Sequence, residues 1–230
     1  MQENNLGKFY IVATPIGNMG DITYRAIETL NTVDYIYAED TRQFGKIAQR
    51  YDIATKVYPY NAHATDKTHN NIIEALLSGK NIALVSDAGT PGISDPGSMI
   101  VNFLRNNHKN VQIVPIPGAS AVVSAVSVSG MFGNQFTFLG FVPHKKSRET
   151  FLNNAISSSI PVIFYESPHR IENTLKFLNE NSPDTKIMIA REMTKMFETI
   201  SIQNAEEHLN KIKENIKELK GEFTLIIFPK

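Results

Sequence analysis

The sequence lacks cysteine altogether, and this absence removes several classes of protein. With no cysteine among its 230 residues, the chain has no disulfide framework, thiolate zinc site, iron–sulfur cluster or cysteine nucleophile. Such a chain suits a reducing compartment, and we expect it to be cytoplasmic. No apolar run approaches the roughly 20 residues of a transmembrane helix. The opening MQENNLGKFYIVAT lacks the basic and long apolar regions of a signal peptide. We therefore expect no membrane association.

An excess of charge of one sign is also missing. Residues 1–140 carry ten Lys and Arg against eleven Asp and Glu, and residues 141–230 carry thirteen against twelve. Neither half is a basic module, so composition gives no argument for nucleic-acid binding, although it does not exclude it. The motifs GxGxxG, GxxxxGK[ST] and HExxH are absent too, which disfavours a dinucleotide dehydrogenase or a P-loop enzyme.

Expected strands and helices alternate along the first half. The strands are predicted at 9–13, 35–38, 56–58, 81–85 and 111–114, with helices at 23–32, 41–51 and 66–77. Asp95-Pro96 reads as an N-cap and first helical position, which opens a further helix to about 107. This order predicts a mainly parallel sheet with helices on both faces.

The segment PIPGAS (115–120) breaks the alternation, so we place a boundary near Pro117, with domains 1–116 and 117–230. In the second half we expect strands at 136–139, 162–165, 186–191, 198–202 and 223–228. We also expect three helices: one that ends at 129, one that Ser167-Pro168 opens and that ends at about 179, and a last one at 205–219. The last helix follows from an apolar stripe at Ala205, Leu209, Ile212, Ile216 and Leu219. The short link between 186–191 and 198–202 predicts antiparallel pairing, hence a mixed sheet with helices.

Three loops rich in glycine and proline follow strands of the first domain: ATPIGN (13–18), SDAGTPGISDPG (86–97) and PIPGAS (115–120). In an open parallel sheet, ligands bind beyond the carboxyl ends of the strands, and glycine allows the backbone to approach them closely. Asp87 and Asp95 can accept from ribose hydroxyls or offset a positive charge on a ligand. The alternatives are tight turns without a ligand and, for Asp95, a cap of its own helix.

Six motifs in a fixed order resemble those of one family: TPIGNMGDIT (14–23), AEDTR (38–42), SDAGTPGISDPG (86–97), PGAS (117–120), FYESPHR (164–170) and AREMTK (190–195). Together they resemble the ribosomal RNA small subunit methyltransferase I group of the tetrapyrrole methylase (class III methyltransferase) superfamily. The resemblance runs from about Tyr10 to Phe228.

The resemblance implies an S-adenosylmethionine-dependent enzyme that methylates the ribose 2′-hydroxyl of a cytidine in the decoding region of 16S rRNA. It also implies a homodimer and two α/β domains, with the cofactor in a cleft between them. The residues that it assigns to the cofactor are Pro15, Ile16, Gly89, Thr90, Ile93, Ser120, Ala121, Tyr165, Met193, Glu222, Phe223 and Thr224. The superfamily often has Gly-Asp-Pro where this chain has Gly89-Thr90-Pro91, and Asp87 is the candidate to replace that aspartate.

Methyl transfer from a sulfonium is an in-line displacement that needs no metal, and positioning of the hydroxyl supplies most of its catalysis. A proton acceptor would help, but the sequence identifies none securely. Asp40, Arg42 and Glu166 are the catalytic candidates, because they follow expected strands, as do Glu39, His169 and Arg170. The alternatives are a structural ion pair for each arginine and simple solvent exposure for His169.

RNA binding requires phosphate contacts. The only dense basic cluster is His144-Lys145-Lys146-Ser147-Arg148, whose alternative is a solvated helix start, although basic charge there opposes the helix dipole. The RNA-binding candidates are Arg42, Lys145, Lys146, Arg148, Arg170 and Lys195, and Arg191 can extend the same patch. Because net charge is zero, we expect recognition of shape, with 16S rRNA presented in the small ribosomal subunit.

Three competing functions stay open. A tetrapyrrole methyltransferase of the same fold is the nearest, although a lysine-rich loop mildly favours RNA. A non-catalytic ribosome-assembly or RNA-binding factor would bind the cofactor without turnover. A metal-dependent phosphohydrolase would use Asp87 and Asp95, but hard-metal sites usually gather more carboxylates.

Overall fold

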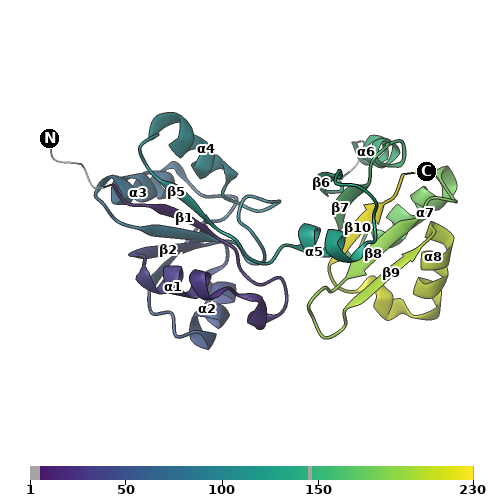
Figure 1. Cartoon of the computed structure of the whole chain (residues 1–230), viewed down its shortest axis with the longest axis horizontal. Helices are drawn as coiled ribbons and strands as arrows, with labels where there is room; N and C mark the ends of the chain where they lie inside the picture. The colour runs from purple at the N-terminus through teal and green to yellow at the C-terminus, as the bar shows by residue number, and fades with distance from the viewer. Residues whose placement is uncertain (1–5, 145–146, 230) are drawn as a thin grey trace. The chain divides into compact units, whose positions relative to one another are not determined.

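The computed structural model describes residues 6–144 and 147–229, apart from the side chains of residues 216 and 217. The chain divides into two compact units between Ser120 and Ala121 (Figure 1). The expected boundary lies near Pro117, so the PGAS segment falls at the end of the first unit. Both units are α/β, and each is described by itself.

The first unit contains a fully parallel sheet with the strand order β3-β2-β4-β1-β5. Its strands are β1 (Phe9–Val12), β2 (Tyr35–Ala38), β3 (Lys56–Pro59), β4 (Ile82–Val85) and β5 (Ile113–Ile116). The predicted parallel sheet is thereby confirmed, although β5 lies two residues beyond its expected range. Pro115 falls within β5, which pairs with β1 alone, and an edge strand tolerates a residue without a backbone N–H.

Helices cover both faces of this sheet (Figure 1). They are α1 (Tyr24–Thr32), α2 (Thr41–Arg50), α3 (Asp66–Leu77) and α4 (Ser98–Asn107), and a 3-10 turn, η1, spans Met19–Asp21. Successive side chains of a strand point to opposite faces. Ala83 and Val85 therefore pack with α1 and α2, whereas Ile82 and Leu84 pack with α3 and α4.

The predicted start of α4 is wrong. The helix begins at Ser98 after Gly97, which has a φ of 134°, and no side chain caps it. A Cβ on Gly97 would lie 2.9 Å from Cδ2 of Leu84, so only glycine fits the close approach of the loop to β4. The loop therefore runs two residues further than Asp95-Pro96 suggests, and Asp95 does not cap the helix.

The second unit contains a mixed sheet with the strand order β6-β7-β10-β8-β9. Its strands are β6 (Thr137–Phe141), β7 (Val162–Glu166), β8 (Ile187–Arg191), β9 (Thr199–Gln203) and β10 (Phe223–Ile227). β6 pairs with β7 in parallel, and the other pairs are antiparallel. The predicted antiparallel pair is confirmed, since β8 and β9 run from Ile187 opposite Gln203 to Arg191 opposite Thr199.

The two faces of this second sheet are covered unequally within the unit. Helices α6 (Ser147–Ile156), α7 (Ile171–Asn181) and α8 (Ala205–Glu214) pack on the face that carries Phe164 and Leu225. The short helix α5 (Ala121–Val128) packs on the other face, which carries Ile163 and Ile226. We call this second surface the α5 face.

Two helix predictions in the second unit need correction. Ser167-Pro168 does not open α7, because the backbone N–H groups of Arg170 and Ile171 both donate to the Ser167 carbonyl and form a turn first. The last helix ends at Glu214 because Asn215 adopts an extended conformation, and a 3-10 turn, η2, follows at Ile216–Leu219. Among the described helices, none is both long and apolar enough to cross a membrane.

Candidate functional site

Two of the glycine loops meet where neighbouring strands send their connections to opposite faces of the first sheet. β1 leads to α1 on one face, and its neighbour β4 leads to α4 on the other. Such a switch point is where open parallel sheets bind ligands. The Thr14 N–H donates to the Gly89 carbonyl at 2.9 Å, and the Gly89 N–H donates back at 3.1 Å. The Thr14 hydroxyl also donates to the Ser86 carbonyl at 3.0 Å, so the two loops form one structure.

The third loop joins them at the same edge. A Cβ on Gly118 would lie 3.0 Å from Cβ of Ala13, and one on Gly89 would lie 3.9 Å from the Ala119 carbonyl oxygen. That same Gly89 position is 3.6 Å from Cγ2 of Ile16. Gly89 has a left-handed φ of 82°, which glycine adopts without strain. The structure therefore brings Ile16, Gly89 and the 118–120 segment together, as the sequence suggested.

The other first-unit residues assigned to the cofactor lie in the same loops with different exposure. Pro15 is buried, Thr90 is partly buried, and Ile93 is 49% exposed. An apolar side chain exposed beside glycine-rich backbone is available to contact a ligand.

Two carboxylates, Asp87 and Asp95, belong to the 86–97 loop, and a third, Glu39, lies beside it. The Asp87 Oδ1 accepts from the Asp40 N–H at 3.0 Å, and the Asp87 N–H donates to Glu39 Oε2 at 3.4 Å. Burial, followed by the negative charge of Glu39, raises the pKa of Asp95 to about 6, although a Ser86 hydrogen bond opposes this shift. Burial also raises the pKa of Glu39. Within the described part of the chain, no three His, Asp or Glu side chains are grouped so that they could hold a metal ion.

Asp40 and Arg42 form a local ion pair at the start of α2. Asp40 caps the helix by accepting from the Arg42 N–H at 2.8 Å, and it also accepts from the guanidinium Nε and Nη2 at 3.1 and 2.7 Å. The side-chain hydrogen bond from Arg42 lowers the pKa of Asp40 to about 2. Asp40 is therefore a poor proton acceptor at neutral pH. The Arg42 side chain is 89% exposed and remains accessible.

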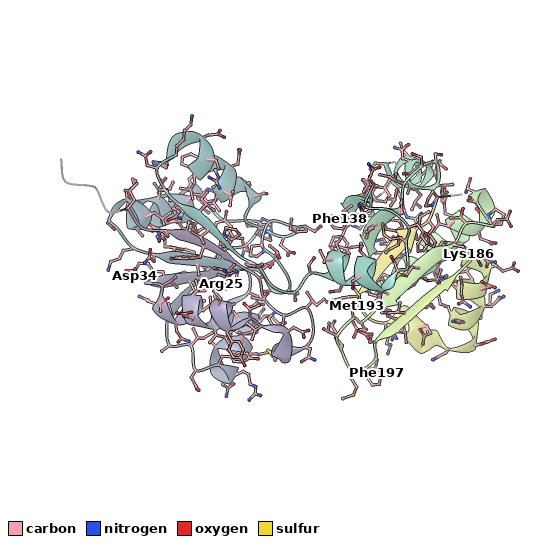
Figure 2. The ribbon with its side chains drawn as sticks, in the orientation of Figure 1. Arg25, Asp34, Phe138, Lys186, Met193 and Phe197 are labelled. Atoms are coloured by element: carbon pink, nitrogen blue, oxygen red, sulfur yellow. The ribbon has the colours of Figure 1, made fainter. Side chains whose placement is uncertain are left out.

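In the second unit, several residues assigned to the cofactor share the α5 face. Tyr165 lies opposite Thr224 in the sheet, and Thr224 lies opposite Ala190. Ala190 and Met193 belong to the hydrophobic cluster of the α5 face, against which Tyr165 and Phe138 pack; Figure 2 labels Met193 and Phe138. Ala121 packs against the same cluster at the start of α5. Phe223 is on the other face, within the core beneath α7, because adjacent residues of a strand alternate.

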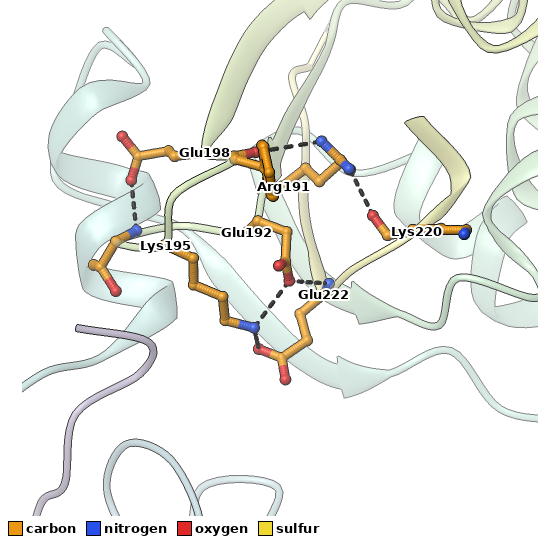
Figure 3. A network of polar contacts seen from close by, with 8 residues as sticks. Arg191, Glu192, Lys195, Glu198, Lys220 and Glu222 are labelled. Carbon is orange, nitrogen blue, oxygen red and sulfur yellow. Dashed lines mark hydrogen bonds and ion pairs between the residues drawn. The ribbon is translucent and has the colours of Figure 1, made fainter. Parts of the chain in front are cut away.

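The loop between β8 and β9 is tied to the start of β10 by the Lys195 cluster, which consists of Glu192, Lys195 and Glu222 (Figure 3). Lys195 Nζ lies 2.9 Å from Glu192 Oε1 and 3.1 Å from Glu222 Oε2. The Glu222 N–H also donates to Glu192 Oε1 at 2.9 Å. A Cβ on Gly221 would lie 2.4 Å from Cγ of Glu192, so glycine is needed there. Lys195, a predicted RNA contact, is thus held between two carboxylates.

Arg191 belongs to the same AREMTK motif as Lys195, and its side chain also has hydrogen-bond partners within the protein. Its guanidinium Nε donates to the Lys220 carbonyl at 2.6 Å (Figure 3). Nη1 donates to the Phe197 carbonyl at 3.3 Å. The side chain is only 9% exposed. These contacts hold the β8–β9 loop and the segment before β10 in place, and they leave little of Arg191 accessible to RNA.

Glu166 is fully buried, and its carboxylate is paired with several donors. It accepts from the Ser167 N–H at 2.8 Å and the Thr174 hydroxyl at 2.6 Å, and it pairs with Arg170 at 2.9 Å. Since Glu166 lies opposite Phe223, it belongs to the face beneath α7 rather than to the α5 face. This geometry gives Glu166 a structural role and places its side chain on the opposite face of the sheet from that of Tyr165.

The same network engages two further predicted RNA contacts. Arg170 Nη1 donates to the Val142 carbonyl at 2.8 Å, and Arg148 Nη2 donates to the Thr174 hydroxyl at 2.7 Å. Both arginines therefore anchor the segment around the basic cluster. His169 is exposed, and Lys145 and Lys146 lie outside the described residues.

Sequence reasoning missed the Lys195 cluster, although a signal was present. Glu192 and Lys195 stand three residues apart in the short link between two expected strands, so their opposite charges are close along the chain. The third member, Glu222, comes from a segment 30 residues further along the chain, and only the antiparallel pairing of β8 with β10 brings it close.

Comparison with known proteins gives consistent matches over nearly the whole chain. A sequence profile described as Tetrapyrrole (Corrin/Porphyrin) Methylases matches residues 8–208. A protein of Vibrio cholerae named Ribosomal RNA small subunit methyltransferase I is 44% identical over 95% of this chain and 76% of its own length. A protein of the same name from Halalkalibacterium halodurans is 42% identical over 98% of this chain and 77% of its own length.

Solved structures show the same fold at low sequence identity. Diphthine synthase superposes with a TM-score of 0.72 over 97% of this chain and 90% of its own, at 14% identity. Uroporphyrin-III-C-methyltransferase from Thermus thermophilus superposes with a TM-score of 0.65 over 96% and 94%, at 17% identity. The profile match and the close relatives carry the assignment that the structures alone could not. The chain therefore belongs to the tetrapyrrole methylase family and, within it, to the ribosomal RNA small subunit methyltransferase I group.

Proposed function

We propose that this protein uses S-adenosylmethionine to methylate the ribose 2′-hydroxyl of a cytidine in the decoding region of 16S rRNA. The observation that carries the proposal is the 42–44% identity, over nearly the whole chain, to proteins named for methylation of small-subunit rRNA. The proposal includes what the family resemblance implies: a cytoplasmic homodimer whose substrate is presented by the small ribosomal subunit.

The chemistry of the glycine loops fits this cofactor. Gly89 and Gly92 have left-handed φ values of 82° and 84°, which allows the backbone to come close to a ligand and to present amides and carbonyls to it. The carboxylates of Glu39, Asp87 and Asp95 favour a ligand that carries positive charge or ribose hydroxyls. We propose that residues of these loops contact the cofactor, and that Tyr165, Met193 and Thr224 on the α5 face do so as well, as the family resemblance implies.

S-adenosylmethionine supplies an electrophilic methyl group on a sulfonium. The task of the chain is then to hold the ribose hydroxyl in line with that methyl group and to exclude competing geometries. Asp40, with a pKa of about 2, is a weak base, whereas Asp95, with a pKa of about 6, is better matched to accepting a proton near neutral pH. Of the carboxylates considered, Asp95 is the one that we propose to test as a proton acceptor.

For RNA, the proposal rests on fewer cations than the sequence suggested. Arg42 is exposed at the carboxyl edge of the first sheet, and the basic segment 144–148 contributes Lys145 and Lys146. Arg148, Arg170 and Lys195 have structural partners, so we do not assign them phosphate contacts. Because few of the candidate cations remain for phosphate contacts, we propose that recognition depends mainly on the shape of the RNA.

A methyl-transfer assay tests the proposal. Small ribosomal subunits from cells that lack this enzyme are incubated with labelled S-adenosylmethionine, and the digested nucleosides are analysed by mass spectrometry. We expect 2′-O-methylcytidine, which a metal chelator does not prevent. Labelling of a tetrapyrrole but of no RNA would replace this proposal by small-molecule methylation, to which the family description points. Cofactor binding without any methyl transfer would indicate a non-catalytic factor.

A matched pair of glycine variants localises the site. Gly89→Ala and Gly130→Ala place a Cβ at left-handed φ values of 82° and 64°, so their backbone strain is similar. A Cβ on Gly130 meets nothing within 4 Å, whereas Gly89 belongs to the joined loops. We expect only Gly89→Ala to weaken cofactor binding, by about tenfold. Equal binding by the two variants would show that the loops do not hold the cofactor.

A further inference from the structure

The hydroxyl of Thr194 is buried and has no partner. Among the side chains that the structure describes, two buried polar atoms lack a hydrogen bond: Thr194 Oγ1 and Gln203 Oε1. An unsatisfied buried hydroxyl is unfavourable, and such a group in a native protein needs a reason. One reason is a ligand that completes the hydrogen bond.

The backbone around this hydroxyl is strained as well. Glu192 and Thr194 have φ values of 52° and 66°, in the left-handed region that residues with a side chain rarely adopt. Thr194 is β-branched, so its conformation is especially unfavourable. Strain of this kind persists only where the surrounding structure imposes it, and it gathers at functional sites.

Hydrogen bonds on both sides of Thr194 impose this conformation. The Thr194 N–H donates to Glu198 Oε2 at 2.6 Å, which fixes the backbone toward β9. On the other side, the Lys195 N–H donates to the Glu192 carbonyl at 3.0 Å, and the Lys195 cluster ties the loop to β10. The loop therefore fixes the backbone of Thr194 without forming a hydrogen bond to its hydroxyl.

We propose that Thr194 is a ligand-contacting residue, and that its hydroxyl forms a hydrogen bond with the cofactor bound beside Met193. This inference rests on the proposed function, since it places a further contact in the same site. Met193 is 8% exposed, adjacent in sequence, and clustered on the α5 face. A hydroxyl can donate or accept, so it can pair with an amino group, a carboxylate or a sugar hydroxyl.

Local charge favours the cofactor over RNA as the occupant. Glu192, Glu198 and Glu222 lie around this loop, together with Lys195 and the guanidinium of Arg191. Arg191 is only 9% exposed and Lys195 is paired with two carboxylates, whereas Glu198 and Glu222 are exposed. These exposed carboxylates repel the phosphates of RNA but attract a ligand that carries ammonium and sulfonium groups. Lys195 is therefore a positioning residue for the loop rather than a phosphate contact.

The test compares three variants of the full chain by calorimetric titration with S-adenosylmethionine and by thermal unfolding without ligand. Thr194→Val removes the hydroxyl and keeps the β-branched shape. We expect its cofactor affinity to fall about tenfold, while its melting temperature is unchanged or higher, because an unpaired hydroxyl is gone. Thr194→Ser keeps the hydroxyl and should bind within twofold of wild type. Gln203→Met removes the other unpaired polar atom and should leave affinity unchanged.

The possible outcomes separate this inference from the proposed function. Wild-type affinity in Thr194→Val, with or without a lower melting temperature, would overturn the role of Thr194 and leave the proposed function intact. In a filter assay with small ribosomal subunits, loss of subunit binding by Thr194→Val at wild-type cofactor affinity would overturn it in favour of an RNA contact. A wild-type chain that binds no S-adenosylmethionine would overturn the proposed function and this inference together. If Thr194→Val does not fold, Thr194→Ala tests the same loss without the β-branch.

Discussion

Replacing Asp95 by asparagine should stabilise the free protein and weaken its hold on a cationic ligand. Burial and the charge of Glu39 raise the pKa of Asp95 to about 6 from an ordinary value of 3.8. The folded state therefore favours the protonated acid more than the unfolded chain does. The stability that Asp95 contributes is fully present below pH 3.8 and is lost as pH rises through about 6. Asparagine keeps the shape of the side chain but never ionises.

The magnitude follows from the size of this shift. About two pKa units correspond to about 3 kcal/mol for a group shielded from solvent, since each unit is worth about 1.4 kcal/mol. Asp95 is only partly buried, and solvent screening reduces the effect to about 1 kcal/mol. For a chain of this length, a difference of about 1 kcal/mol shifts the melting temperature by about 2–4 °C.

The assay is thermal unfolding of wild type and Asp95→Asn between pH 4.5 and 8, with Asp184→Asn as the control on an exposed aspartate. We expect the advantage of Asp95→Asn to grow as pH rises toward 7 and then to stay constant. Affinity for S-adenosylmethionine should change in the opposite sense, falling several-fold in Asp95→Asn at pH 8. An unfolding advantage that is independent of pH, or that is largest at pH 4.5, would refute this account of Asp95.

Three further substitutions test other parts of the structure. Glu166→Gln leaves Arg170 without its buried partner and should lower the free energy of unfolding by about 3 kcal/mol in a urea titration, with cofactor affinity within twofold of wild type. Gly97→Ala places a Cβ at a φ of 134° and 2.9 Å from Leu84, so urea unfolding should show a loss of about 2 kcal/mol. Arg42→Ala should weaken subunit binding in a filter assay and reduce the slope of its salt dependence by about one, without changing cofactor affinity.

The first sheet could be predicted because its signals are local. Ile82 to Val85 form a continuous apolar run, as expected for a strand buried on both faces, and the structure places two of these side chains on each face. The loops that follow such strands must gather at one edge because parallel strands share their direction. The meeting of the Ile16, Gly89 and 118–120 segments is a consequence of that geometry.

The partners of charged side chains could not be predicted, because they come from distant segments. Lys195 and Arg170 read as available cations in the sequence, but Glu222 and the Val142 carbonyl reach them only after the second sheet has formed. The start of α4 was missed for a similar reason. Asp95-Pro96 has good capping chemistry, but the contact of Gly97 with Leu84 decides where the helix begins.

The distribution of backbone strain supports the candidate site independently of any relative. Among the described residues other than glycine, φ is positive at Asp52, Ser94, Glu192 and Thr194. Three of these four lie in the two loops that we assign to ligand binding, 86–97 and 192–198. Each such conformation costs about 1–3 kcal/mol, which packing and hydrogen bonds elsewhere must offset. The Lys195 cluster and the Thr14–Gly89 bridge provide that restraint. The fold therefore holds both loops in conformations that the loops alone would not adopt. Such preorganisation is expected of binding segments, because it lowers the entropy that is lost when the ligand binds.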